Sequence, residues 1–144
     1  MTEIDQEQLR IASEFIEALP HSRALGMRLV SIGDGEAVIE MPYADHLVGD
    51  PATGVIHGGA VSALMDTCGG ASVMCHPETG EMTATLDLRI DYMRPAVPGR
   101  TITARATCYH VTRSVAFVRA SASDGDADDP VAAATGAFTV ERPE

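Results

Sequence analysis

The sequence predicts an α+β fold in which an antiparallel sheet curls around one long helix. Three observations support this prediction. A nearly uncharged helical segment lies near the middle of the 144-residue chain, two short apolar runs precede it, and four runs rich in strand-forming residues follow it. The chain is long enough for one domain with its own core and too short for a second.

The first expected element is an amphipathic helix over residues 5–19, which Pro20 ends. Its apolar side chains recur at helical spacing and form one face. The members of this face are Leu9, Ala12, Phe15, Ile16 and Leu19. We therefore divide the chain into an N-terminal amphipathic helix, residues 1–20, and a single domain, residues 21–144.

The strands are predicted from alternation and from turn residues. Residues 27–32 and 37–41 are short apolar runs, and the intervening Gly33-Asp34-Gly35 is typical of a hairpin turn. Residues 83–92 alternate apolar and polar side chains, as a half-buried strand does. Three more strands are expected over residues 101–110, 115–123 and 131–140.

The central helix is the most informative part of the chain. Gly54 and the pair Gly58-Gly59 mark backbone that bends or is approached closely. From residue 60 to residue 74 the side chains are small or apolar, and Asp66 is the single charge. Burying a lone carboxylate costs free energy, so this acid is exposed, partnered or used. The opposite stripe is a predicted core face: Val61, Leu64, Met65, Cys68, Ser72 and Cys75.

His57 stands nine residues before Asp66, at the start of the predicted helix. Nine residues span roughly 13 Å along a helix axis, so the two side chains do not meet within one helix. The residues around the acid are mostly small, which lets another backbone or a ligand approach it. If the histidine and the acid cooperate, a second copy of the chain supplies one of them.

Composition argues against several function classes. The formal net charge of −11 disfavours nucleic acid as a partner, because duplex binding needs a basic surface. No stretch approaches the roughly 18 apolar residues of a membrane span. The acidic start at residues 1–5 lacks the parts of a signal peptide, which predicts a cytoplasmic protein. Much of the excess charge lies in residues 124–129, which we interpret as a solvated loop.

The three cysteines indicate neither a disulfide nor a metal site. Cys68 and Cys75 would lie two helical turns apart, roughly 10 Å, which is too far for a disulfide. We expect both to be small buried side chains. No cluster has metal-ligand spacing, so no metal is expected. The Gly-x-Ser-x-Gly turn of serine hydrolases is also missing.

The order of elements, with His57-Gly58-Gly59 opening the helix and Asp66 after it, resembles the hotdog-fold acyl-CoA thioesterases. The phenylacetate-degradation (PaaI-like) group is the most similar. The resemblance runs from about residue 25 to residue 140, and it is specific because five segments occur in order. These segments are Leu25-Gly26-Met27, residues 57–66, Asp91-Tyr92-Met93-Arg94-Pro95-Ala96, Pro98-Gly99 and Arg113-Ser114-Val115-Ala116-Phe117.

This resemblance implies a hotdog fold, with the sheet wrapped around the long central helix and the N-terminal helix as an addition. It implies an enzyme that hydrolyses an acyl-CoA thioester to free acid and CoA. No separate cofactor is implied, because coenzyme A is part of the substrate. In the family, two subunits join their sheets edge to edge and form active sites at the interface. A homodimer is therefore expected, and dimers commonly pair into tetramers.

The resemblance also implies roles for individual residues. Asp66 matches the catalytic carboxylate, which acts either as general base toward water or as nucleophile through an anhydride. Gly58 matches the position whose N–H stabilises the oxyanion. His57 matches the motif histidine beside the reacting group, and Thr85 matches a hydroxyl position that holds the attacking water.

Contacts to coenzyme A are implied for Gly59 and for two arginines. Arg113 is the first candidate for binding the phosphates, and Arg94 is the second. One departure concerns the asparagine that family members often carry six residues before the motif histidine. This chain has Pro51 there. The positioning of water or of the histidine would then fall to another residue.

Plainer interpretations remain open at each position. The acid could be a surface carboxylate, the histidine a helix-start residue, the threonine an ordinary strand residue, the glycines turn formers and the arginines solvated cations. The main alternative function is a non-catalytic hotdog protein that binds acyl-CoA. A hotdog hydratase needs a different Asp and His motif, which the chain lacks. A structural scaffold protein is the remaining alternative.

Overall fold

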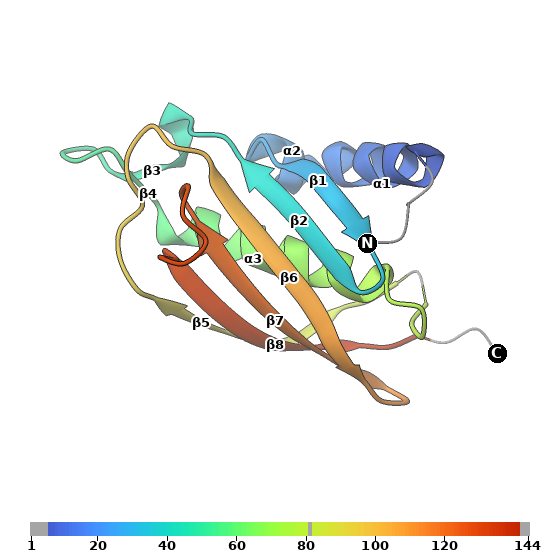
Figure 1. The fold of residues 1–144 in the computed structure, drawn as a ribbon. Helices are drawn as coiled ribbons and strands as arrows, with labels where there is room; N and C mark the ends of the chain where they lie inside the picture. Colours follow the sequence, from blue (N-terminus) through green and yellow to red (C-terminus); the bar gives the residue numbers. More distant parts are fainter. Residues whose placement is uncertain (1–5, 81, 142–144) are drawn as a thin grey trace.

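The computed structural model describes residues 6–80 and 82–141. A six-stranded antiparallel sheet, with strand order β1-β2-β6-β7-β8-β5, curves around helix α3 (Gly58–Met74), as Figure 1 shows. The predicted hotdog architecture is confirmed. The strands are β1 (Arg28–Gly33), β2 (Glu36–Met41), β5 (Thr85–Tyr92), β6 (Ile102–Val111), β7 (Val115–Ser123) and β8 (Ala132–Thr139).

Four further elements were not predicted. A two-stranded sheet of β3 (Val48–Asp50) and β4 (Val55–Ile56) lies ahead of α3, after a short 3-10 turn at Asp45–Leu47. The N-terminal helix α1 (Gln6–Ala18) is followed by a second short helix, α2 (Pro20–Ala24). Pro20 therefore begins a helix rather than only ending one, because proline fits the first helical turn, where its missing N–H is not needed.

The hairpin between β1 and β2 is confirmed. Asp34 and Gly35 both have positive φ angles, 53° and 80°, and Gly33 pairs with Glu36 across the turn. This is the conformation that two-residue hairpin loops adopt, and it explains the Asp-Gly sequence.

The core lies between α3 and the concave face of the sheet. Of the predicted core face of α3, five residues are buried and Cys75 is half-buried. The Cys68 thiol lies 3.3 Å from the Ala37 carbonyl oxygen and 3.5 Å from that of Ala104, and burial raises its pKa to about 12. Cys68 is thus a packed, unreactive side chain.

The two sheet edges differ. Helix α1 packs against β1 at one edge, whereas β5 forms the other edge (Figure 1). The register of β5 on β8 shifts between Thr85 and Asp87. Leu86 was predicted to share a face with Leu88 and Ile90, but this shift interrupts the alternation and Leu86 is 58% exposed.

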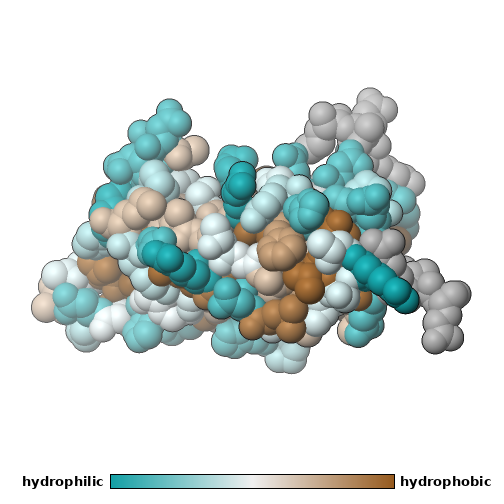
Figure 2. Space-filling model, turned by 90° about the horizontal axis from the view of Figure 1, so that it is seen from below, coloured by the Kyte–Doolittle hydropathy of each residue, from teal (hydrophilic) through white to brown (hydrophobic). Residues whose placement is uncertain are grey.

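Apolar side chains remain exposed on and near β5. Tyr92 and Met93, at the end of the strand, are 53% and 57% exposed. Figure 2 views the molecule from below Figure 1 and shows hydrophobic side chains gathered between hydrophilic ones. An unpaired edge with exposed apolar residues favours pairing with another strand. In the described part of the chain, no helix is both long and apolar enough to span a bilayer.

Candidate active site

Asp66 is a half-buried acid in the third turn of α3. The Thr85 hydroxyl, at the start of β5, donates a hydrogen bond of 2.7 Å to Asp66 Oδ1. The structure therefore brings together two predicted site residues that are 19 positions apart in the chain. The other carboxylate oxygen, Oδ2, accepts no hydrogen bond from any described residue.

The small residues beside the acid admit an aromatic ring. Phe138 of β8 packs over the helix, and a Cβ on Gly69 would lie only 2.9 Å from its Cζ atom. A Cβ on Gly70 would meet Phe138 and Thr83 at ordinary contact distance. The glycines of α3 thus let β8 approach the helix closely, one turn after Asp66.

Asp66 and Thr85 open onto a cavity of about 810 Å³ between α1 and α3. Apolar side chains from α1, α3 and β8 form most of its wall, and Met82 also lines it. The carboxylate and the hydroxyl are thus polar groups on a mainly apolar surface. A few polar groups on an apolar, concave surface are typical of small-molecule sites.

His57 caps the N-terminus of α3. Its Nδ1 atom accepts a 2.7 Å hydrogen bond from the Gly59 N–H, and its carbonyl oxygen accepts the Ala60 N–H at 3.0 Å. In a neutral ring, this arrangement places the proton on Nε2, which is free to donate. The Gly58 N–H makes no hydrogen bond to the described residues, so it is the free donor of the helix start.

Neighbouring strands fix the backbone around His57. Its N–H donates to the Leu47 carbonyl oxygen at 2.8 Å. A Cβ on Gly49 of β3 would lie 2.7 Å from the His57 Cα atom, so only glycine lets β3 approach. The Tyr92 hydroxyl donates to the Gly58 carbonyl oxygen at 2.9 Å. Tyr92 was missed as a site residue, although it belongs to one of the segments that carry the resemblance.

The helix start and the acid are separate within one subunit. Asp66 stands eight positions after Gly58 in α3, which corresponds to about 12 Å along the helix axis. Asp66 contacts β5, whereas His57 contacts β3 and the first turn of α3. This separation agrees with the geometric expectation for the two groups.

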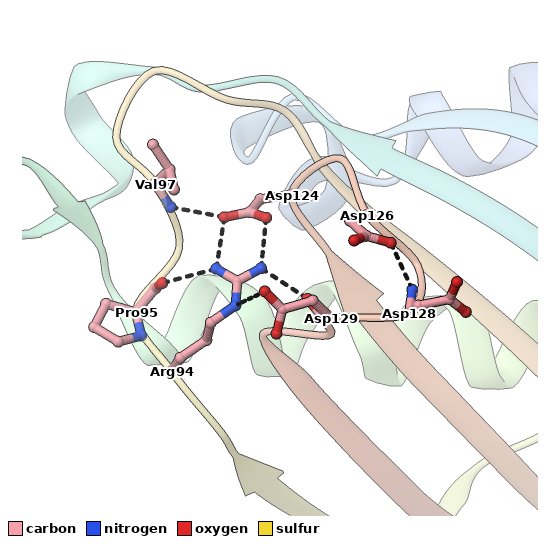
Figure 3. Close-up of polar contacts among 7 residues, drawn as sticks. All are labelled: Arg94, Pro95, Val97, Asp124, Asp126, Asp128 and Asp129. Atoms are coloured by element: carbon pink, nitrogen blue, oxygen red, sulfur yellow. Dashed lines mark hydrogen bonds and ion pairs between the residues drawn. The ribbon is translucent and has the colours of Figure 1, made fainter.

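Arg94 forms a second, separate polar cluster (Figure 3). Its Nη1 and Nη2 atoms donate to the two Asp124 carboxylate oxygens at 2.9 and 2.7 Å. Nη2 also donates to the Asp129 carbonyl oxygen, and Nε lies 3.3 Å from Asp129 Oδ2. The Val97 N–H donates to Asp124 Oδ2 at 2.8 Å. The cluster ties the β5–β6 loop to the β7–β8 loop.

Asp124 corrects the interpretation of the acidic run. Its side chain is 2% exposed, and the bidentate Arg94 contact holds the pKa of its carboxyl well below the usual range. The prediction of a solvated loop was therefore wrong for Asp124. It holds for Asp126 and Asp128, which are exposed.

Comparison with known proteins gives the family. Residues 53–131 match the model of the thioesterase superfamily. The chain belongs to this superfamily. The medium/long-chain acyl-CoA thioesterase YigI of Escherichia coli (strain K12) is 28% identical over 128 residues, which cover 79% of this chain and 82% of YigI.

Solved structures agree with this assignment. A Pseudomonas aeruginosa protein is 40% identical with a TM-score of 0.82, over 92% of this chain and 98% of that protein. A mutant of the phenylacetic acid degradation protein PaaI from Thermus thermophilus is 27% identical with a TM-score of 0.74, over 85% and 99%. The resemblance to PaaI-like hotdog thioesterases is confirmed, and this protein is a thioester hydrolase.

The remaining predicted site residues of this thioesterase lie elsewhere. Arg113 is exposed in the turn between β6 and β7, and within the described ranges it forms no ion pair. Pro51 lies in an exposed turn that Asp50 stabilises by accepting hydrogen bonds from the Ala52 N–H and the Thr53 hydroxyl. Among residues 6–80 and 82–141, no group of three or more acidic, His or Cys side chains could hold a metal ion.

Proposed function

We propose that this thioesterase hydrolyses acyl-CoA to a free acid and CoA, with Asp66 as the reacting carboxylate. The observation that carries the proposal is the 2.7 Å hydrogen bond from Thr85 to Asp66 on the wall of a largely apolar cavity. This arrangement puts an acid with a spare acceptor atom where an apolar acyl group could lie. The name of the related YigI supports coenzyme A as the leaving group.

Thr85 suits the positioning of water. Its hydroxyl hydrogen is directed at Asp66 Oδ1, so its oxygen lone pairs are free to accept a hydrogen bond from a water molecule. That water would lie beside the carboxylate. As general base, Asp66 takes a proton from the water while the oxygen attacks the thioester carbonyl.

Nucleophilic attack by Asp66 is the other route. The carboxylate then forms an anhydride with the acyl group, and water hydrolyses the anhydride. In both routes the C–S bond breaks, and the CoA thiolate leaves and takes up a proton. Both routes need the same acid at the same place.

The oxyanion that forms on the thioester carbonyl needs a hydrogen-bond donor. Within one subunit, the free N–H at the start of α3 lies too far from Asp66 to supply it. We assign this role to the Gly58 N–H of the partner subunit, because that donor is free and lies at the positive end of α3. The Nε2–H of the partner's His57 is a second hydrogen-bond donor that we assign to the thioester carbonyl. Gly59 has no side chain, which leaves space beside the His57 ring for the substrate.

Edge-to-edge pairing through β5 would place the two half-sites together. The exposed Leu86, Tyr92 and Met93 at this edge support such a homodimer. Pairing of dimers into a tetramer is a further expectation from the family, and native mass measurement distinguishes the two assemblies.

We propose that Arg113 is the main residue that binds the CoA phosphates, because its guanidinium is exposed. Arg94 is second, since it would have to leave Asp124 to bind phosphate.

The experiment is an assay of purified protein against short, medium, long and aryl acyl-CoAs, with released thiol as the readout. Wild type should hydrolyse at least one class, and Asp66→Asn should hydrolyse none. If wild type binds acyl-CoA but hydrolyses no thioester, the protein is a binding protein and the proposal fails.

A further inference from the structure

Helix α1 lines the cavity beside Asp66 along most of its length. Its lining residues follow one helical stripe that spans about 12 Å. They are Gln8, Ile11, Ala12, Phe15 and Ile16, and Leu19 just after the helix continues the wall. Ile11 and Phe15 are 55% and 50% exposed although both are large and apolar. A stripe of exposed apolar side chains that borders a cavity marks a surface that another apolar group covers.

The opposite wall runs along α3. It begins at Asp66 and continues through Gly70 to Met74 and Cys75, about 13 Å toward the C-terminal end of the helix. The cavity is therefore elongated, and the carboxylate–hydroxyl pair lies toward one end of this wall. A chain whose reacting carbonyl lies at Asp66 would extend between the two helices.

We propose that this cavity is the acyl pocket, that α1 is its outer wall, and that Ile11 and Phe15 select an unbranched aliphatic acyl group of medium length. The inference rests on the proposed function, because it takes Asp66 as the reacting group. Ile11 and Phe15 act on specificity, while Asp66 and Thr85 carry the chemistry.

Three features define the acyl class. The volume of about 810 Å³ lies in the upper part of the range for small-molecule sites, so a two-carbon acyl group would leave most of the apolar wall uncovered. Met74 and Met82 are flexible side chains that fit a flexible aliphatic chain. Asp66 lines the cavity, and the protein is strongly acidic, which disfavours an acyl group with a second carboxylate.

The first test uses the absence of tryptophan from the sequence. Phe15→Trp places a single indole in the cavity wall, and Glu17→Trp on the exposed surface of α1 is the matched control. The probes are S-decyl-CoA and S-methyl-CoA, thioethers that cannot be hydrolysed. S-decyl-CoA should shift the Phe15→Trp emission to shorter wavelength, S-methyl-CoA should not, and Glu17→Trp should respond to neither.

An equal response of both variants, or none from Phe15→Trp, would overturn the pocket assignment. A Phe15→Trp emission that changes with protein concentration and not with S-decyl-CoA would assign the cavity to a second copy of the chain. Phe15 is half exposed, so its replacement leaves the core intact.

The second test measures chain-length preference. In Phe15→Ala, kcat/KM for decanoyl-CoA should fall about tenfold relative to wild type, while kcat/KM for acetyl-CoA stays within about twofold. Glu17→Ala is the control and should leave both values unchanged. A uniform fall for both substrates would show that Phe15 has no part in selecting the acyl group.

The two proposals fail differently. If Asp66→Asn abolishes hydrolysis but Phe15→Ala leaves the chain-length profile unchanged, the thioesterase proposal stands and the pocket inference fails. If no thioester is hydrolysed but S-decyl-CoA still shifts the Phe15→Trp emission, the pocket stands and the catalytic proposal fails.

Discussion

Two carboxylates in this protein have opposite surroundings. Asp124 is buried, and both of its oxygens accept hydrogen bonds from Arg94, with a further one from the Val97 N–H. Asp66 is half-buried beside a cavity and, among the residues that the structure describes, accepts a hydrogen bond from Thr85 alone. An acid whose acceptor sites are filled holds loops together. An acid with a free oxygen at a cavity is able to take a proton or attack a carbonyl.

The largest effect is expected at Asp66. Asp66→Asn keeps the shape of the side chain but removes the basic oxygen, so kcat should fall by a factor of about 10³. The fold should remain, as circular dichroism would show, and so should the proposed dimer, which size-exclusion chromatography would test. Asp128→Asn is the control, because Asp128 is an exposed acid in the β7–β8 loop. A variant with near wild-type kcat would remove Asp66 from the mechanism.

Asp124 should affect stability rather than chemistry. In Asp124→Asn the Arg94 guanidinium loses its buried, bidentate carboxylate partner and keeps only the exposed Asp129, and the melting temperature should fall by about 5 to 10 °C. Asp128→Asn again serves as the control and should melt like wild type. An unchanged melting temperature would mean that the Arg94 cluster does not stabilise the loops.

The same carboxyl should produce a pH dependence. Its pKa is lower in the folded state, chiefly through Arg94, so its stabilisation is present above the unfolded pKa of about 4. This contribution is lost as pH falls from there toward the lower folded-state value. Denaturant unfolding between neutral and acidic pH should therefore show a steeper loss of stability in wild type than in Asp124→Asn. Equal slopes would contradict the depressed pKa.

Thr85 should have a smaller effect than Asp66. Thr85→Val keeps the volume but removes the hydroxyl, so kcat should fall about tenfold, while Thr85→Ser should retain most activity. This pair of variants separates the hydrogen bond from the packing of β5. Loss of activity in both variants would point to packing instead.

Arg113 should have the smallest effect. If its guanidinium binds phosphate equally in the ground and transition states, Arg113→Ala raises KM several-fold, by about threefold to tenfold, and leaves kcat unchanged. Arg113→Lys should recover part of the affinity, since the charge remains. A fall in kcat at constant KM would argue against this role.

Local patterns predicted most of the fold. The alternation of β5 and the uncharged length of α3 are properties of neighbouring residues, and both elements lie within about two positions of the expected ranges. Asp66 stood out because it is the only charge on that helix. The family resemblance, rather than spacing, singled out Thr85, which lies 19 residues away and meets Asp66 only through the packing of β5 on α3.

The burial of Asp124 could not be predicted in the same way. Its partner Arg94 lies 30 residues earlier, and the two loops meet only because β5 pairs with β8 and β8 with β7. A run of acidic residues is usually exposed to solvent, and nothing in the neighbouring sequence indicates that one member of the run is buried. The cavity was also beyond sequence reasoning, because it depends on how α1 lies relative to α3.

Gly49 determines how freely the loop ahead of α3 can vary. Any side chain there would overlap the His57 backbone, with a Cβ only 2.7 Å from its Cα atom. Pro51 and Ala52, by contrast, are exposed turn residues. In a saturation library of this loop, we expect tolerant positions to surround one that accepts only glycine. Activity screens should identify Gly49 as essential because it lets β3 lie against the His57 backbone.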